Sequence, residues 1–388
     1  MKTIGILIER QRTYGRRLCE GIIRFANECG DWSLRIIEFW ELAAKLRANS
    51  YDGIIARVLN DSIAKELLRA KCPVVDVFCE KPIASFGAAD QDAVAVGQMA
   101  ARHFLEHRFT KFAFCGYDGR SYSDQRYNAF RRMLELNHFQ SLRYKSPQSD
   151  LKDFDESVIM RERFEMPYAK KRLAKWVASL PKPIGVFCAH DMRAWQLCEI
   201  CKQLGIKVPD EVAILGVDND ELVCQFTSPG ISSIDQNAVG IGYAAANTLR
   251  QMMSEPGSVP APAKVKPAVL FERGSTATYP LEPKWLSDSL VFIRSHISSQ
   301  ISALDVYRHI GKSHTIVNNA FRKKLGTTVQ REIARMRLLE AKRLVVSTDM
   351  PFCSIATKCG FASLQYFSSS FVREYALSPT AMRNSVHS

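Results

Sequence analysis

Carboxylates follow several apolar runs in the first three quarters of the chain, where they could bind a small polar molecule. Asp90, Asp191 and Asp218 each come after such a run, Gln236 follows another, and Arg126 lies near the start of an amphipathic stretch. Carboxylate and amide oxygens accept hydrogen bonds and a guanidinium donates them, so these groups suit a polyol or sugar. An aspartate between a strand and a helix is equally favoured as a helix cap, and that alternative stays open for each of them.

The elements that must position these residues alternate along the first 274 residues. Strand-length apolar runs occur at 4–8, 34–39, 53–56, 74–78, 112–115, 185–188 and 212–217, and amphipathic stretches at 15–29, 92–106, 124–136, 168–180 and 192–204. This alternation predicts parallel sheets covered by helices, and its length favours two linked α/β lobes. Ligands of such sheets bind beyond the carboxyl ends of the strands, where the polar residues above are expected.

Two short segments near the C-terminus echo each other. One is Gly311-Lys-Ser-His-Thr-Ile-Val-Asn-Asn-Ala-Phe321, and the other is Gly360-Phe-Ala-Ser-Leu-Gln-Tyr-Phe-Ser-Ser-Ser-Phe371. In each, a Gly precedes a Ser that can cap a helix, and two apolar residues four positions apart can be buried together. Both segments therefore predict the turn and second helix of a helix-turn-helix.

The remaining faces of these two helices carry side chains that can contact DNA. Asn and Gln pair with adenine edges, and Leu can touch a thymine methyl group. The candidates are His314, Thr315, Asn318, Asn319 and Arg322 in the first helix, and Leu364, Gln365, Ser368 and Ser369 in the second. From Leu281 onward there are 15 Lys and Arg against 7 Asp and Glu, in a chain of net charge +13. An ordinary helical bundle is the alternative, but this local excess favours a surface that meets phosphates.

Helices are also expected at 304–310, 331–347 and 354–359, with Thr327-Thr-Val-Gln330 as a capping box for the long one. Apolar residues recur at helical period along 331–347, so this helix can pack against both units and fix their separation. Prolines and small polar residues around Pro280 and Pro283 predict a connection between domains. We therefore place a sensor domain at 1–274, a linker at 275–284 and a DNA-binding domain at 285–388.

The C-terminal part resembles a known family. The motif comprises Ile355-Ala356, Gly360-Phe361, Tyr366-Phe367, Phe371 and Ser378-Pro379 followed by Arg383. It closely resembles the signature of AraC/XylS-type transcription regulators, which implies an all-α domain with two recognition helices about 34 Å apart on one face of DNA. By position, the base-contacting residues of the family match Thr315, Asn318, Asn319, Leu364, Gln365 and Ser369. Asn319 stands where members of the family often have Arg, so the preferred bases cannot be transferred.

The N-terminal part resembles another family over residues 1–274. The resemblance is carried by Asp90, Ser123-Asp-Gln-Arg126, Ala189-His-Asp191, Gly205-Ile-Lys-Val-Pro-Asp210, Leu215-Gly-Val-Asp-Asn219 and Ile234-Asp-Gln236. This order is similar to the effector domain of LacI-type repressors and the related periplasmic sugar-binding proteins. It implies ligand contacts in the cleft between two lobes from Arg126, Asp191 and Asp218, with Asp90, Gln236, Tyr14 and Asn219 as further contacts. His190 stands where the family usually has Asn.

A LacI-like sensor joined to an AraC-type reader is the arrangement of one group of pentose-operon regulators, which the chain resembles along its full length. The resemblance implies a cytoplasmic activator that binds double-stranded operator DNA and takes a monosaccharide effector, a pentose such as D-xylose. It also implies a homodimer that could contact RNA polymerase. A response to another carbohydrate, or action as a repressor, remains the alternative.

Other function classes receive less support from the sequence. A transport binding protein needs export, but the apolar start is followed at once by Glu9, Arg10 and Arg12, and no stretch approaches the ~20 apolar residues of a membrane span. Phosphate-loop, dinucleotide and nucleophile-elbow motifs of enzymes are absent, so we expect neither an enzyme nor a cofactor. We also expect no metal site. The pair Cys198 and Cys201 is predicted to pack in a helix, and His103 and His107 are predicted at the surface and the core edge.

Overall fold

The computed structural model describes residues 1–48, 50–146 and 167–387. The chain divides into two compact units, one formed by residues 1–106 and 110–276, and the other by 107–109 and 277–388. The division after Thr276 lies inside the expected linker, whose bounds stay a prediction. Across the described ranges, every helix is too short or too polar to cross a membrane.

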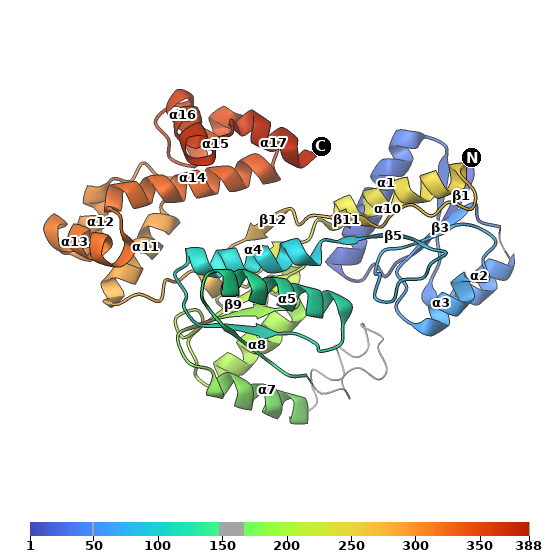
Figure 1. Cartoon of the computed structure of the whole chain (residues 1–388), viewed down its shortest axis with the longest axis horizontal. Coiled ribbons are helices and arrows are strands. Elements are labelled where there is room, and N and C mark those ends of the chain that lie inside the picture. The colour runs from blue at the N-terminus through green and yellow to red at the C-terminus, as the bar shows by residue number, and fades with distance from the viewer. Residues whose placement is uncertain (49, 147–166, 388) are drawn as a thin grey trace. The chain divides into compact units, whose positions relative to one another are not determined.

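The first unit contains two six-stranded sheets, one in each lobe (Figure 1). The first has the order β11-β5-β4-β3-β1-β2 and the second β12-β10-β9-β8-β6-β7. Its strands pair in parallel except for β10 with β12. The first sheet consists of β1 (Lys2–Leu7), β2 (Trp32–Ile36), β3 (Gly53–Ala56), β4 (Val74–Asp76), β5 (Gly87–Gln91) and β11 (Ala263–Val265). The second consists of β6 (Phe112–Cys115), β7 (Ser141–Arg143), β8 (Ile184–Cys188), β9 (Val212–Val217), β10 (Ser232–Asp235) and β12 (Val269–Phe271).

Helices cover both sheets, as the alternating pattern predicts. The first lobe has α1 (Thr13–Cys29), α2 (Leu42–Ala48), α3 (Asp61–Leu67) and α10 (Ala238–Ser254). The second lobe has α4 (Ala93–Glu106), α5 (Ser121–Leu136), α7 (Pro167–Ser179), α8 (Asp191–Gln203) and α9 (Glu221–Gln225). The chain crosses between the lobes after β5, after β10 and after β11, so three chain segments connect the lobes.

The short strands β7, β11 and β12 are not expected from the sequence. Each has three residues and lies at a sheet edge. β7 and β11 contain no buried residue and show no apolar run, whereas β12 is an apolar run of only three residues, Val269-Leu-Phe271. Asp90 is also placed differently from the expectation, because it lies within β5 and not beyond its end.

Gly97 of α4 has a direct effect on the site, since a Cβ there would lie 2.3 Å from the carbonyl oxygen of Arg126. The absence of a side chain lets α4 hold α5, and with it Arg126, at close range.

The second unit is helical throughout its described part. It contains α11 (Lys284–Ser295), α12 (Ala303–Ile310), α13 (His314–Leu325), α14 (Val329–Ser347), α15 (Phe352–Lys358), α16 (Leu364–Tyr375) and α17 (Pro379–His387). Ile333 and Met336 of α14 pack in one hydrophobic cluster with α13, whereas Leu338 and Leu344 pack in a second cluster with α16. The long helix thus joins the two helix-turn-helix units. Its cap is Thr328, whose side chain accepts from the Arg331 backbone N–H, so the expected capping box of Thr327 and Gln330 is wrong by one residue.

Candidate functional site

A cavity of about 490 Å³ lies beyond the carboxyl ends of strands from both sheets. Its volume is within the ~300–1,000 Å³ usual for small-molecule sites. The segments that follow β1, β3, β4, β8, β9 and β10 contribute to its wall. Among the residues proposed from the sequence, those that line it are Tyr14, Asp90, Arg126, Asp191, Asp218 and Gln236.

Arg126 is a buried cation in this wall, with 2% of its surface exposed. Its guanidinium donates hydrogen bonds to the carbonyl oxygen of Ala189, to Gln91 Oε1 and, at 2.9 Å, to Gln236 Oε1. Its Nε is buried and has no hydrogen-bond partner among the described residues. Because its bonded acceptors are neutral, the positive charge stays available to polar groups in the cavity.

Asp218 is linked to Arg126 through one amide, because Gln236 Nε2 donates to Asp218 Oδ1. The backbone of Asp218 has φ 108° and that of Asn219 has φ 50°, both in the region that favours glycine. Such a conformation costs about 1–3 kcal/mol per residue and persists where the surroundings enforce it. This strained turn is what directs the Asp218 carboxylate at the cavity.

Asp191 lines the cavity, but its oxygens are used by the protein itself. Oδ1 accepts from Ser233 Oγ at 2.6 Å, and Oδ2 accepts from the Asp220 backbone N–H at 2.8 Å and from Cys224 Sγ at 3.5 Å. Burial, and then the charge of Asp218, hold the pKa of Asp191 well above its ordinary value. Asp191 therefore braces the turn that carries Asp218.

Tyr14 and Asp90 lie on the first-lobe side of the cavity. Burial raises the pKa of the Tyr14 hydroxyl well above its ordinary value, and the carboxylates of Asp90 and Asp218 raise it further. Burial also raises the pKa of Asp90, although Lys264 Nζ lies 3.3 Å from its Oδ2 and opposes this shift. A neutral phenol between two carboxylates can donate its proton to one acceptor and accept a hydrogen bond from a ligand hydroxyl.

Asn219 does not line the cavity. It is buried, its Oδ1 accepts from Arg273 at 2.8 Å, and its backbone N–H donates to Ser233 Oγ at 3.0 Å. His190 does line the cavity, and its Nδ1 accepts from the Arg193 backbone N–H at 3.1 Å, which caps α8. The surroundings of these residues, and not their types, decide their roles.

The sequence reasoning missed several residues of the first-lobe wall. Glu9, Arg57, Phe78 and Gln91 all line the cavity, and Glu9 and Arg57 form an ion pair. Glu9 and Arg57 directly follow apolar runs, so the rule that selected the aspartates would have found them.

Asp76, at the end of β4, was also missed. Its carboxylate accepts backbone N–H bonds from Val58 at 3.2 Å, Phe78 at 2.9 Å and Cys79 at 3.1 Å. Burial raises the pKa of Asp76 to about 6. Asp76 thus shapes the turn from which Phe78 reaches the cavity.

The first recognition helix, α13, begins as expected. Ser313 Oγ accepts from the Ile316 backbone N–H at 3.5 Å, and Val317 and Phe321 are fully buried. The predicted residues on its outer face that are exposed are His314, Thr315, Asn319 and Arg322. Asn318 is half-buried instead, since its amide donates to Tyr307 Oη at 2.6 Å and accepts from the Val329 backbone N–H at 3.3 Å.

The second recognition helix, α16, has the same construction. Ser363 Oγ accepts from the Tyr366 backbone N–H at 3.1 Å, and Phe367 and Phe371 are fully buried. Leu364, Gln365 and Ser369 are exposed, whereas Ser368 is half-buried. The sequence reasoning passed over Tyr366 and, in α13, Ile316, whose side chains are 52% and 53% exposed. From the sequence, both residue types suit the apolar core face. Only the tertiary structure shows that these two side chains are exposed.

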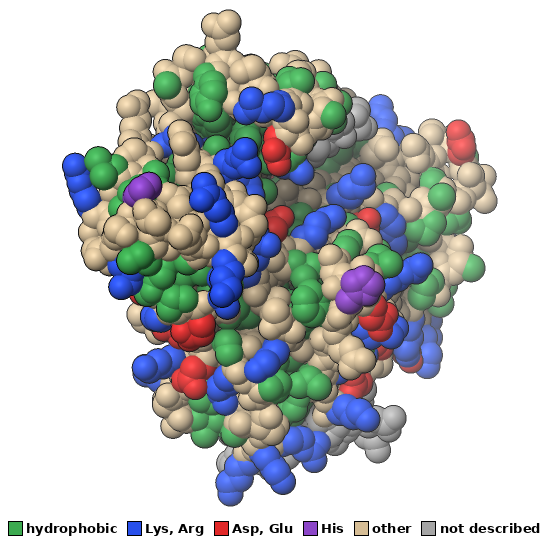
Figure 2. All heavy atoms as spheres, turned by 60° about the vertical axis from the view of Figure 1, so that its left-hand side comes forward, with side chains coloured by type: hydrophobic (Ala, Val, Ile, Leu, Met, Phe, Trp, Pro, Cys, Tyr) green, Lys and Arg blue, Asp and Glu red, His purple; other side chains and the backbone are tan. Residues whose placement is uncertain are grey.

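Basic side chains are frequent on the molecular surface. On the face drawn in Figure 2, Lys and Arg outnumber Asp and Glu. Arg335 and Arg343 of α14 pair with Glu332 and Glu340, one turn earlier on the same helix. Arg322, Lys323 and Lys324 at the end of α13 are exposed cations of the kind that contact phosphates.

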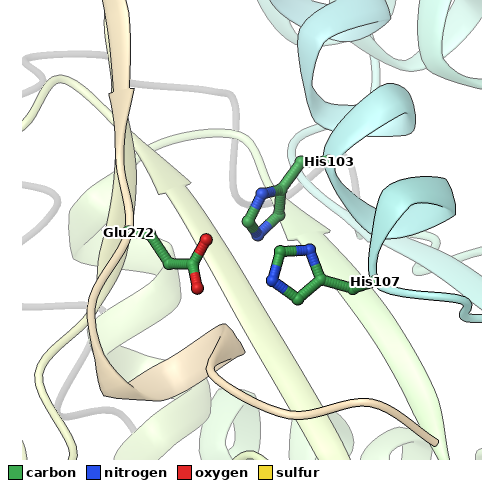
Figure 3. A group of neighbouring side chains, drawn as sticks. All are labelled: His103, His107 and Glu272. Atoms are coloured by element: carbon green, nitrogen blue, oxygen red, sulfur yellow. The ribbon is translucent and has the colours of Figure 1, made fainter. Parts of the chain in front are cut away.

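His103 and His107 differ from their expected placement, because both are buried. Figure 3 shows them at the end of α4 with Glu272. One ring nitrogen of each histidine and one carboxylate oxygen of Glu272, the atoms that could bind a metal ion, lie within 4.8 Å of one another. His103 Nε2 lies 3.0 Å from Thr276 Oγ1, and the His107 ring stacks on Tyr279 at 5.0 Å between centroids. Both imidazoles therefore serve the packing of the protein.

Comparison with known proteins identifies both parts of the chain. Residues 101–276 match the periplasmic binding protein-like domain, and residues 307–385 match a helix-turn-helix domain. The expected pairing of a LacI-like effector domain with an AraC-type helix-turn-helix domain is confirmed.

Full-length relatives have the same organisation. The chain is 27% identical over 390 residues to the xylose operon regulatory protein of Haemophilus influenzae, covering 98% of this chain and 97% of the relative. A solved xylose-binding transcription activator is 26% identical, with a TM-score of 0.61 and coverage of 99% of this chain and 98% of that one. A ribose-bound LacI family regulator from Enterococcus faecium, 20% identical over 72% of this chain and 100% of its own with a TM-score of 0.55, shares the fold of the first unit. The expected similarity to xylose operon regulatory proteins is therefore confirmed.

Proposed function

We propose that this chain, similar along its length to xylose operon regulatory proteins, is a sugar-responsive transcription regulator that binds DNA through α13 and α16. The observation that carries the proposal is the presence, in one chain, of a polar cavity in the first unit and two capped recognition helices in the second. Arg126, Asp218, Asp90, Gln236 and Tyr14 are the proposed sugar contacts. Asp191 and Asn219 hold the turn that presents Asp218.

Further parts of the proposal come from the relatives. The effector is a monosaccharide, with D-xylose the first candidate, and no other cofactor is required. The regulator acts in the cytoplasm as an activator and a homodimer on double-stranded DNA, with RNA polymerase as a further partner. A sugar can shift the conformational equilibrium only by binding one state of the two lobes more tightly than the other.

The proposed base contacts are His314, Thr315, Asn319, Leu364, Gln365 and Ser369, with Arg322 in α13 and Ser368 in α16 as further DNA contacts. Asn318 acts indirectly, by fixing α13 against the start of α14.

Selection from a random duplex DNA pool, with and without D-xylose, tests both halves of the proposal. Enrichment of one DNA motif that depends on the sugar supports it. A motif enriched equally without sugar, together with unchanged thermal unfolding in D-xylose, L-arabinose and D-ribose, would remove the sensing half. Failure to enrich any motif would remove the DNA-reading half.

A further inference from the structure

The first-lobe wall of the cavity holds a buried ion pair that the proposed sugar contacts do not include. Glu9 follows β1 and Arg57 follows β3, two neighbouring strands in which Leu7 lies opposite Ala56. The two side chains pair with each other and keep only 11% and 8% of their surface exposed. Both line the cavity. A buried ion pair carries a desolvation cost that good geometry and further hydrogen bonds must offset.

Several elements fix the guanidinium of this pair. Its carbon lies 4.5 Å from the centroid of the Phe78 ring and 5.7 Å from that of Tyr14. The Arg57 backbone N–H donates to the carbonyl oxygen of Leu7 at 2.9 Å. Arg57 is therefore a fixed cation, and it determines where the Glu9 carboxylate lies.

One of the two carboxylate oxygens of Glu9 lacks a hydrogen-bond donor among the described residues. Its Oε1 accepts from Arg57, whereas its Oε2 is buried with no hydrogen-bond partner within the described part of the chain. A buried acceptor without a donor is costly, and it costs more when the group is charged. A ligand hydroxyl in the cavity would supply the missing donor.

The charges beside Glu9 disfavour an anionic ligand group at this wall. Five carboxyl groups line the cavity, against four guanidiniums. The Arg16 guanidinium is used by the carbonyl oxygens of Arg10 and Gln11 and by Thr13 Oγ1. Arg57 is matched by Glu9, so a second carboxylate at this wall would meet an unsatisfied negative oxygen.

We propose that Glu9 accepts a hydrogen bond from a hydroxyl of the effector, and that Glu9 and Arg57 together restrict the cavity to neutral sugars and reject sugar acids. The inference rests on the proposed sugar-sensing function. Glu9 is the contact, and Arg57 is the positioning residue that holds it.

Isothermal titration calorimetry of the full chain tests this selectivity, with D-xylose, D-ribose and L-arabinose and the aldonate of each as ligands. Glu9→Gln should weaken the neutral sugar that binds wild type best by about tenfold to hundredfold. It should also shift the ratio of aldonate to aldose affinity toward the aldonate by at least about tenfold, because the negative charge of Glu9 is removed beside the Arg57 guanidinium and the new amide can donate.

The double variant Glu9→Gln/Arg57→Gln separates the two roles, because it removes both charges of the pair together. It should lose affinity for the neutral sugar without gaining affinity for the aldonate, since the guanidinium is gone. Glu38→Gln is the matched control, because it removes a glutamate paired with Arg10 outside the cavity, and its affinities should stay near wild type.

Two results would overturn the inference, and they are distinguishable. Unchanged sugar affinity and unchanged aldonate selectivity in Glu9→Gln would refute the role of Glu9 while leaving sugar sensing in place. If wild type binds neither aldoses nor aldonates, the proposed sensing function fails, and this inference fails with it.

Discussion

The polar side chains of the cavity are bonded largely to one another, whereas those of the two recognition helices largely face solvent. Asp191 alone receives three donors from its surroundings, and Gln236 joins Arg126 to Asp218. Gln365 and Asn319 lie exposed on α16 and α13. Buried polar groups must find partners, but exposed groups find water. Substitutions of the bonded side chains in the cavity therefore generally alter both stability and ligand binding. Substitutions on the exposed faces of α13 and α16, the reading surface, alter only which DNA sequence is bound.

The sharpest way to break this comparison is to remove a cavity carboxylate without harming the fold. Asp218→Gly suits this purpose because glycine readily adopts φ 108°. We expect sugar affinity to fall by about a hundredfold or more, since hydrogen bonds to a charged group are lost. The free energy of unfolding should stay within about 1 kcal/mol of wild type, because the backbone strain that glycine relieves offsets the hydrogen bond that Gln236 Nε2 loses. Calorimetry with D-xylose and urea unfolding measure the two quantities. A large loss of stability would show that the carboxylate is structural.

The second prediction concerns the brace behind Asp218. Asp191→Ala should lower the free energy of unfolding by about 2–5 kcal/mol, because the Ser233 hydroxyl and the Asp220 N–H lose their acceptor. Urea unfolding of the full chain checks it. Glu135→Ala, which removes one member of an exposed pair with Arg131, is the control and should cost at most about 1 kcal/mol. Equal effects of the two changes would contradict the brace.

The pH dependence of stability tests the same difference between buried and exposed polar groups, through the buried carboxyl of Asp76. Its pKa is raised from 3.8 to about 6 in the folded protein, so between these values the folded state binds more protons than the unfolded state. Its contribution to stability therefore falls as pH rises from 4 to 6 and is constant above that, a loss of about 3 kcal/mol at 1.36 kcal/mol per pKa unit.

Urea unfolding of wild type and Asp76→Asn at pH 4 and pH 7 isolates this contribution, since the other carboxyls titrate in both proteins. The advantage of wild type over the variant should shrink at pH 7. At exposed Asp61, Lys81 lowers the pKa, so the advantage over Asp61→Asn should not shrink. A constant difference for Asp76 would mean that its carboxylate is solvated.

The smallest expected effects are on the reading surface. Gln365→Ala should cost about 1–3 kcal/mol at one or two base pairs and leave other positions unchanged. Asn318→Ala should weaken all DNA sequences alike, because its amide ties α13 to Tyr307 and to the start of α14. Binding to a library of single-base variants distinguishes the two. A base-specific loss in Asn318→Ala would return that residue to the set of base contacts.

Local signals made much of this molecule predictable from its sequence. The start and the buried face of α13 and α16 follow from a capping Ser and two apolar residues four positions apart, all within about a dozen residues of sequence. The strand-end rule brought Asp191, Asp218 and Gln236 to one cavity, and the resemblance to LacI-type effector domains added Tyr14.

Partners distant in the chain decide the rest. Ser233 lies 42 residues from Asp191, and Arg273 lies 54 residues from Asn219, so no local pattern separates a brace from a contact. Asp76 and the edge strands β7 and β11 escape prediction for the same reason, since tertiary packing gives them their roles.

Helix α14 has a consequence for the operator. Its 19 residues contribute to the hydrophobic clusters of both helix-turn-helix units, so α13 and α16 are held at one distance and one rotation. On B-DNA each inserted base pair rotates the downstream duplex by about 34°, since a turn takes about 10.5 base pairs. The two subsites read by one chain should therefore tolerate no change of spacing, and a single inserted base pair between them should turn one subsite out of phase with its helix.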